Sequence, residues 1–154
     1  MTDVFDTKES VSELVPHKGK MFLLDRVRDY DLKENSITTE IDISRDNLFY
    51  EEELGGVPAW VAFEYMAQSV SASSGLHGRA KGEKPKAGFI MSVSGFKADI
   101  PVFKSSETVV INVLENIRMD KAVTFEGSAT VNGTLAVTAK LNTVEVDDPK
   151  SSLN

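Results

Sequence analysis

The chain has 154 residues, a formal net charge of −7 at neutral pH and no cysteine. This length fits one domain with its own hydrophobic core, and the lack of cysteine excludes disulfides, thiolate nucleophiles and cysteine metal sites. The acidic balance argues against general affinity for nucleic acid, which requires lysine and arginine to neutralise phosphates. The start lacks the basic and then apolar pattern of a secretory signal, so we expect a cytoplasmic protein.

The first part of the chain changes from a polar start to strand-like alternation. Residues 1–9 are polar and are expected to be flexible, and Ser10 and Glu13 have the spacing of a capping box before a short helix that Pro16 ends. Residues 21–29 and 36–44 are predicted strands. In the second of them, four side chains alternate with polar ones and should share a buried face: Ile37, Thr39, Ile41 and Ile43.

A long apolar helix is predicted from Pro58, which suits a first helical position, to Gly75 or Gly78. Apolar residues cover too much of its circumference for a surface helix with one buried stripe, so we expect it to be wrapped by other elements. A membrane span is the competing interpretation. Glu64, Gln68 and four serines interrupt the apolar run before it reaches the ~20 residues that a bilayer requires, so we reject it.

The second half of the chain contains four more predicted strands, at 86–97, 108–119, 122–131 and 134–146. Asn132-Gly133 lies between the last two and predicts a type I′ hairpin turn. The same hairpin should bury one face of each strand. The expected inward residues are Val123, Phe125, Ala129 and Val131 against Leu135, Val137, Ala139 and Leu141.

The order of two strands, one apolar helix and four strands has a simple solution. We expect an α+β hotdog fold, in which an antiparallel sheet of about six strands wraps around one long central helix. Residues 10–147 would form this single domain, between a flexible N-terminus at 1–9 and a flexible tail at 148–154.

Two stretches resemble the β-hydroxyacyl-(acyl carrier protein) dehydratases, and the resemblance continues through residues 95–102 and 125–133, so that it covers about residues 10–146. They are Val15-Pro-His-Lys-Gly-Lys-Met-Phe-Leu-Leu-Asp-Arg-Val27 and Gly56-Val-Pro-Ala-Trp-Val-Ala-Phe-Glu-Tyr-Met-Ala-Gln68. The Pro-Ala-Trp and Glu-Tyr-Met-Ala-Gln portions are most similar to the divergent branch associated with aryl-polyene pathways. The resemblance implies a dehydratase of 3-hydroxyacyl thioesters. The family's Gly-His-Phe-Pro segment is replaced here by Phe49-Tyr-Glu-Glu-Glu-Leu-Gly-Gly56.

Such a dehydration requires a base, an acid and hydrogen-bond donors for the thioester oxygen. Glu64 is the only acidic residue of the apolar helix and is the candidate acid, although it could simply face solvent. His17 is the candidate base or substrate contact, with a structural hydrogen bond as the alternative. His77 is 13 residues beyond Glu64, roughly 20 Å along the helix axis, so the two cannot share a substrate atom within one chain.

Further residues are expected to bind the substrate. The backbone of Gly56 and Val57 approaches the positive end of the helix and could donate to the thioester carbonyl, although a Gly-Gly pair is often only a turn. Gln68 lies one turn beyond Glu64 and could hold that side chain, hold a substrate oxygen, or make a structural hydrogen bond. Phe89 and Met91 of a second subunit would line an apolar acyl tunnel, or would be core in a monomer.

Two charged segments flank the helix. Four basic residues follow it and are expected to contact the acidic surface or the phosphopantetheine phosphate of a carrier protein, unless they form a solvated loop: Arg79, Lys81, Lys84 and Lys86. Glu51–Glu53 precede it, where negative charge is favourable with the helix dipole. A catalytic replacement for the missing family histidine is the alternative for these three glutamates.

Three functions remain open on the sequence alone. The first is a 3-hydroxyacyl-(acyl carrier protein) dehydratase, the second a hotdog acyl thioesterase, and the third a non-catalytic acyl-thioester-binding partner of an active homologue. Because a hotdog sheet has exposed edges, we expect a homodimer or a hetero-oligomer with a homologue. The expected partners are an acyl carrier protein or acyl-CoA. No cofactor is expected beyond the phosphopantetheine arm of the substrate, and no metal or nucleotide motif is found.

Overall fold

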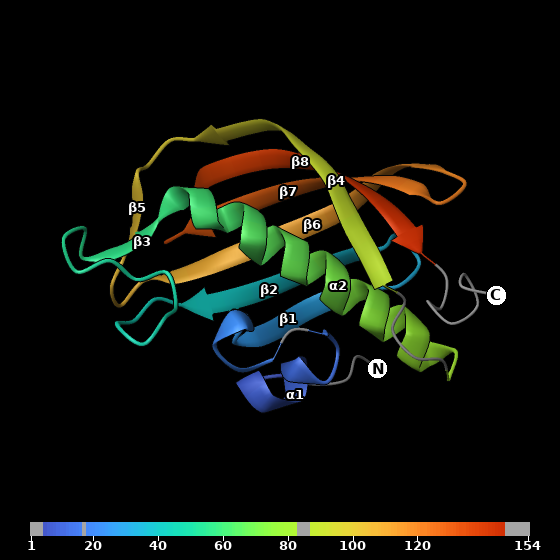
Figure 1. The fold of residues 1–154 in the computed structure, drawn as a ribbon, viewed down its shortest axis with the longest axis horizontal. Helices are drawn as coiled ribbons and strands as arrows, with labels where there is room; N and C mark the ends of the chain where they lie inside the picture. The colour runs from blue at the N-terminus through green and yellow to red at the C-terminus, as the bar shows by residue number, and fades with distance from the viewer. Residues whose placement is uncertain (1–4, 17, 83–86, 147–154) are drawn as a thin grey trace.

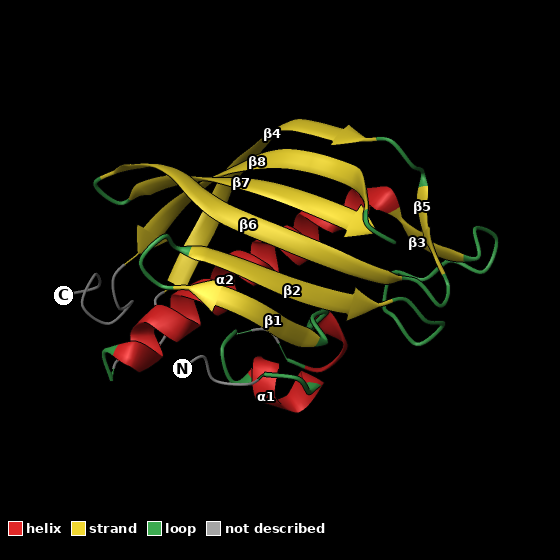
Figure 2. Ribbon diagram, turned by 180° about the vertical axis from the view of Figure 1, so that it is seen from behind, coloured by secondary structure: helices red, strands yellow, loops and turns green. Residues whose placement is uncertain are grey.

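The computed structural model describes residues 5–16, 18–82 and 87–146, with the backbone alone at 87–89 and 146. A six-stranded antiparallel sheet curves around one long helix, α2 (Ala62–Ala80), as Figure 1 shows. The opposite view in Figure 2 shows the sheet covering one side of that helix. The strand order is β1 (Arg26–Asp31), β2 (Ser36–Asp42), β6 (Thr108–Met119), β7 (Ala122–Val131), β8 (Thr134–Val146) and β4 (Ala87–Ala98). The predicted hotdog fold is confirmed.

One side of α2 packs into the concave face of the sheet. Its larger buried side chains are Tyr65, Met66 and Leu76, and the hydroxyls of Thr39 on β2 and Ser69 on α2 are hydrogen bonded at 2.7 Å inside this contact. The other side is only partly covered, and Trp60 just before α2 remains 49% exposed. The helix is therefore wrapped on one side by this chain, with apolar side chains left on the other.

The bounds of α2 differ from the prediction at both ends. Pro58 is the N-cap of a short 3-10 helix, η2 (Ala59–Val61), that leads into α2. At the other end, the helix continues past Gly75 to Ala80. A Cβ atom at Gly75 would collide with the carbonyl oxygen of Leu14. The glycine is needed for this close approach of the N-terminal segment and does not end the helix.

The N-terminal segment is anchored from Phe5 onward, within the stretch expected to be flexible. Phe5 is 3% exposed, and its carbonyl accepts a hydrogen bond from Val27 N at 2.8 Å. The short helix α1 (Lys8–Ser12) has Thr7 as its N-cap, and the capping box joins Thr7 and Ser10. The predicted box was placed three residues too late, because Ser10 completes the box and does not open it.

The β-hairpin of β7 and β8 confirms most of its predicted features. Asn132 and Gly133 have φ angles of 53° and 77°, as a type I′ turn requires. Leu135 is the exception, since it is 48% exposed while Ala136 and Val137 are buried. The pairing register shifts at Ala129 and Thr130, and this irregularity turns Leu135 outward.

Two three-residue strands were not predicted. β3 (Gly56–Pro58) pairs with β5 (Val102–Lys104) as a separate two-stranded ribbon at the start of the helix. Three residues are too few to show an alternating pattern, so the sequence gives no signal for them. This ribbon closes the end of the molecule at which α2 begins (Figure 1).

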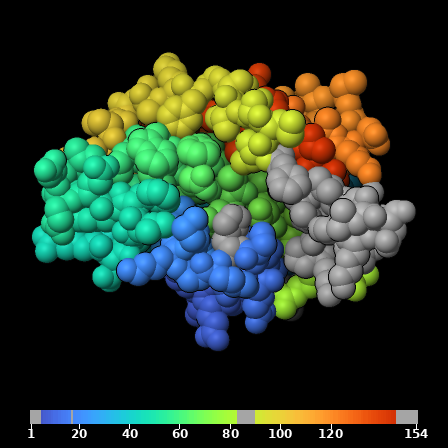
Figure 3. Space-filling model, in the orientation of Figure 1, coloured from blue at the N-terminus to red at the C-terminus, as the bar shows by residue number. Residues whose placement is uncertain are grey.

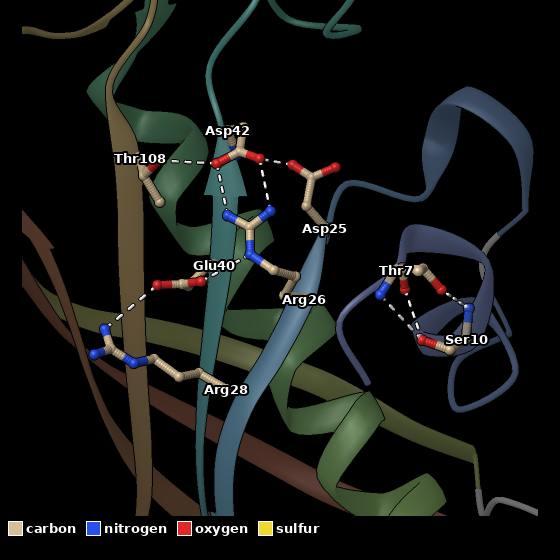
Figure 4. A network of polar contacts seen from close by, with 8 residues as sticks. All are labelled: Thr7, Ser10, Asp25, Arg26, Arg28, Glu40, Asp42 and Thr108. Carbon is tan, nitrogen blue, oxygen red and sulfur yellow. Dashed lines mark hydrogen bonds and ion pairs between the residues drawn. The ribbon is translucent and has the colours of Figure 1, made fainter. Parts of the chain in front are cut away.

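A polar network secures the outer strands β1 and β2 (Figure 4). Arg26 donates to both carboxylate oxygens of Asp42 at 2.7 Å and to Glu40 at 2.8 Å. Asp42 also donates its backbone N–H to Asp25 at 2.7 Å. Burial raises the pKa of Asp25, whereas the Arg26 guanidinium lowers the pKa of Asp42.

Among the described residues, no helix is long and apolar enough to cross a membrane.

Candidate active site

Glu64 lies in the first turn of α2 and is partly buried. Within the described part of the chain, no residue hydrogen bonds to its carboxylate or forms an ion pair with it. A carboxylate that is neither solvated freely nor paired is available to a substrate. This prediction from the sequence is therefore compatible with the geometry, although the chemical role of Glu64 stays a prediction.

An aromatic cluster adjoins Glu64 at the start of the helix. Trp60 lies one helical turn before it, with its ring centroid 5.5 Å from that of Phe49 and 6.1 Å from that of Phe63. Figure 3 shows the green segment, in which α2 begins, at the surface between the blue N-terminal segment and the yellow segment. Sequence reasoning did not single out this cluster. The three-residue spacing of Trp60 and Phe63 is a signal that could have found their contact, whereas Phe49 comes from a loop.

Gln68 lies one turn beyond Glu64 and is 1% exposed. Its Oε1 accepts a hydrogen bond from Leu23 N at 2.8 Å, and its Nε2 donates to Met21 O at 2.7 Å. Both the oxygen and the nitrogen of the amide are thus bonded to the backbone. Of the roles considered for Gln68, the structural hydrogen bond is the one that the geometry supplies.

The ribbon strand β3 brings Gly56 and Val57 to the same end of the molecule. Val57 is fully buried, and a Cβ atom at Gly56 would collide with the carbonyl oxygen of Phe103. The Gly56 N–H donates to Glu51 O at 3.4 Å, which is at the weak limit of hydrogen bonding. Glycine is required here by packing, and its amide remains only loosely engaged.

His17, the candidate base, lies outside the described residues. The chain before it is fixed on α2 where Leu14 meets Gly75, and the chain after it is fixed where Met21 meets Gln68. Between these points, Lys18 Nζ donates to Ser12 O at 2.8 Å.

The remaining predicted contacts are spread over two other regions. Met91 is 68% exposed on the edge strand β4, and the side chain of Phe89 lies outside the described residues. At the end of α2, Arg79 pairs with Glu13 at 3.3 Å and stacks over Phe5, while Lys81 is exposed. Lys84 and Lys86 also lie outside the described residues. Arg79 therefore lies at the opposite end of α2 from Glu64.

His77 belongs to a separate polar cluster near the end of α2. Its Nε2 lies 3.1 Å from Asn35 Oδ1, which also accepts from Ser73 Oγ at 2.8 Å. Asn35 Nδ2 donates in turn to Glu115 at 2.9 Å. Burial lowers the pKa of His77. This histidine joins the helix to the β1–β2 turn, a contact that sequence spacing could not reveal.

The face of the sheet away from α2 carries a groove, and the described residues hold no metal site. In the described ranges, no group of three or more histidine, aspartate or glutamate side chains could hold a metal ion. A groove of about 780 Å³ crosses the sheet and is lined by residues such as Thr38, Asn112 and Lys140. Because Thr38 alternates with the buried Ile37 and Thr39, this groove lies on the face away from α2 and away from Glu64.

Comparisons with known proteins agree with this fold. The dehydratase heterocomplex ApeI:P from Xenorhabdus doucetiae is similar with a TM-score of 0.82 and 26% identity, covering 93% of this chain and 95% of that chain. Cj0977, a sigma28-regulated virulence protein from Campylobacter jejuni, has a TM-score of 0.65 and 13% identity, with 93% and 92% covered.

A hypothetical thioesterase with coenzyme A from Streptococcus pneumoniae TIGR4 has a TM-score of 0.62 and 9% identity, with 79% of this chain and 85% of that chain covered. At such identities, the last two similarities show the fold alone. The comparison with curated proteins found no match. A family model described as ApeP-like, ApeP dehydratase, matches residues 9–154. Since this match spans nearly the whole chain, the protein belongs to the ApeP-like family of dehydratases.

Proposed function

We propose that this dehydratase acts on 3-hydroxyacyl thioesters of an acyl carrier protein. The observation that carries the proposal is the Glu64 carboxylate, which is partly buried in the first turn of α2 and has no partner among the described residues. In a mostly apolar helix, such a group costs stability unless a ligand uses it. Membership of a dehydratase family gives the reaction class, and the 3-hydroxyacyl thioester is the substrate that suits it.

The reaction removes a proton from C2 and a hydroxyl from C3, so that a C2–C3 double bond forms and water leaves. In the proposed mechanism, Glu64 protonates the departing hydroxyl and His17 removes the C2 proton. The Gly56 N–H is the proposed donor to the thioester oxygen. Its present bond to Glu51 O is 3.4 Å long, and a carbonyl oxygen with developing negative charge is a stronger acceptor.

We propose that the site is completed by a second hotdog subunit, either another copy or a homologue. Two features support this: the apolar surface at the start of α2, where Trp60 of η2 is 49% exposed, and the position of β4 at the edge of the sheet. The similar ApeI:P structure is itself described as a dehydratase heterocomplex. In such a pair, Phe89 and Met91 of one subunit would line the path of the acyl tail beside Glu64 of the other.

The carrier protein would meet the basic residues near the end of α2. Arg79 is partly engaged by Glu13, and Lys81 is exposed. Together with Lys84 and Lys86, these residues would steer an acidic carrier, and this contribution should weaken with salt. Neutralising all four should lower carrier-protein affinity and reduce its salt dependence. Unchanged affinity and salt dependence would exclude this surface.

The experiment offers a 3-hydroxyacyl carrier protein to the chain alone and to the chain with a homologous hotdog subunit, and follows the acyl group by mass spectrometry. Loss of water supports a dehydratase, release of free acid would indicate a thioesterase, and no change in either sample would indicate a binding partner only. Glu64→Gln should abolish water loss, whereas the exposed Glu34→Gln control should not. Glu53→Gln tests the glutamate that precedes the helix. Water loss that survives Glu64→Gln would contradict the assignment.

A further inference from the structure

Gln68 forms an unusual pair of contacts between α2 and the segment that leads into β1. The side chain is 1% exposed. Its amide accepts from Leu23 N at 2.8 Å and donates to Met21 O at 2.7 Å. In an extended chain, the C=O of one residue and the N–H of the second residue after it point to the same side. The Gln68 amide therefore takes the place that a neighbouring strand would occupy.

This pairing explains where the sheet begins. The predicted strand started at Met21, but β1 starts at Arg26. Asp25 N is bonded to Glu40 O at 3.0 Å, so contact with β2 begins there. Before that residue, the backbone polar groups at Met21 and Leu23 are satisfied by the helix. The chain changes its partner from α2 to β2 within a few residues.

The contact lies one helical turn from the candidate acid. Glu64 and Gln68 are four residues apart on α2, which places them on neighbouring positions of the same helix face. The 3-10 helix η1 (Gly19–Met21) ends at the residue whose carbonyl Gln68 binds. The amide thus fixes residues 18–24, named here the α2-bound segment, at a set distance from the Glu64 turn.

We propose that Gln68 is a positioning residue, which touches no substrate atom and sets the spacing between Glu64 and the α2-bound segment. The inference deepens the proposed function and rests on it, because in sequence His17 directly precedes this segment. It also replaces two of the roles first considered for Gln68. The two backbone bonds hold the amide, and the side chain is 1% exposed, so the proposal assigns it no contact with Glu64 or with a substrate oxygen. A displacement of about 1 Å in such a site can cost about 100-fold in rate.

The test compares Gln68→Met with Ser69→Ala in the protein and assay described above. Methionine has a similar length but cannot bond Met21 or Leu23. Ser69 is the next residue, is also fully buried, and bonds Thr39 and Tyr65 O, each at 2.7 Å. Both variants should lower Tm. Only Gln68→Met should lower kcat, by about 10- to 100-fold, with KM changed by less than about threefold because no substrate contact is lost.

Amide hydrogen exchange provides a readout that does not depend on activity. In Gln68→Met, Leu23 should lose protection while the β6 and β7 amides keep theirs. Unchanged kcat, or continued protection of Leu23, in an active enzyme would overturn this inference and leave the proposed function intact. A wild-type protein without dehydratase activity would overturn both. If Gln68→Met does not fold, Gln68→Glu keeps the acceptor for Leu23 and should give an intermediate kcat. A wild-type kcat in that variant would contradict the proposal.

Discussion

The two ends of α2 place polar side chains in opposite situations. At the first end, Glu64 lies beside an aromatic cluster with no partner among the described residues. At the other end, Ser73 and His77 share the Asn35 side chain, which in turn bonds Glu115. The first end holds a group that is left available, and the second holds a network in which each named side chain has a partner.

Whether a polar side chain has hydrogen-bond partners distinguishes a catalytic candidate from a structural residue better than its residue type does. Histidine is the usual residue for proton transfer near neutral pH, yet His77 is bonded to a turn and serves to hold the helix end. Glu64 would be an ordinary surface residue on a polar helix, but here it is partly buried and has no partner among the described residues. A polar group that the fold does not use is the stronger candidate for chemistry.

The largest expected effect is the loss of activity in Glu64→Gln. Removing a general acid lowers kcat by about 100- to 10,000-fold. The fold should be unaffected or slightly stabilised, because a partly buried charge without a described partner is removed. The measurement is kcat together with Tm, and Glu34→Gln is the control. A reduced kcat that is matched by a large loss of Tm would indicate unfolding and not chemistry.

At the other end of α2, the expected effect is on stability. Asn35→Gly should destabilise the protein by about 1–3 kcal/mol, because Ser73, His77 and Glu115 lose their shared partner. Glycine is chosen because Asn35 has a φ of 54°, a conformation that glycine adopts without strain. Urea unfolding gives the free energy of unfolding, and the activity of the folded protein should remain near that of wild type. A folded variant with kcat as low as that of Glu64→Gln would erase the contrast between the two ends.

Two carboxyl groups near the start of the sheet should respond to pH in opposite directions. Burial raises the pKa of Asp25 above 3.8, so its contribution to stability is present below 3.8 and is lost as pH rises through the raised value. Arg26 lowers the pKa of Asp42 below 3.8, so its contribution is present above 3.8 and is lost as pH falls through the lowered value.

The free energy of unfolding, measured across acidic pH, tests the opposite pKa shifts of Asp25 and Asp42. Relative to wild type, Asp25→Asn should become more stable as pH rises above 3.8, whereas Asp42→Asn should become less stable. The same trend in both variants would contradict the assigned causes.

The smallest effect is expected on the outer face of β8. Leu135→Thr should change the free energy of unfolding by less than about 0.5 kcal/mol, because Leu135 is 48% exposed. The buried neighbour Val137→Ala should cost about 1–3 kcal/mol. Equal losses measured by urea unfolding would place Leu135 inside, as the alternation alone predicted.

The sequence was sufficient to predict the bounds of elements that have a long and regular hydrophobic pattern. The bounds of β6, β7 and β8 match their predicted ranges, because alternation over ten or more residues defines a strand and its buried face. Irregularities within such elements were not predictable. The register shift that exposes Leu135 adds no sequence signal of its own, and the function of Gly75 depends on Leu14, which is distant in the chain.

For the candidate site, the sequence identified residue types but not their partners. Glu64 could be selected because it is the only acid in an apolar helix. The role of Gln68 depends on Met21 and Leu23, which are more than 40 residues away in sequence and meet it only after folding. The aromatic cluster likewise depends on Phe49 from a loop. His17 remains a prediction from the resemblance and from its position in sequence.

The most direct measurement is the mass of the acyl group after a 3-hydroxyacyl carrier protein is incubated with wild type, Glu64→Gln and Asn35→Gly, each with the homologous subunit. We expect water loss with wild type and Asn35→Gly and none with Glu64→Gln, although all three are folded. Water loss with Glu64→Gln at the wild-type rate would contradict the proposal that the Glu64 carboxylate of α2 performs the chemistry.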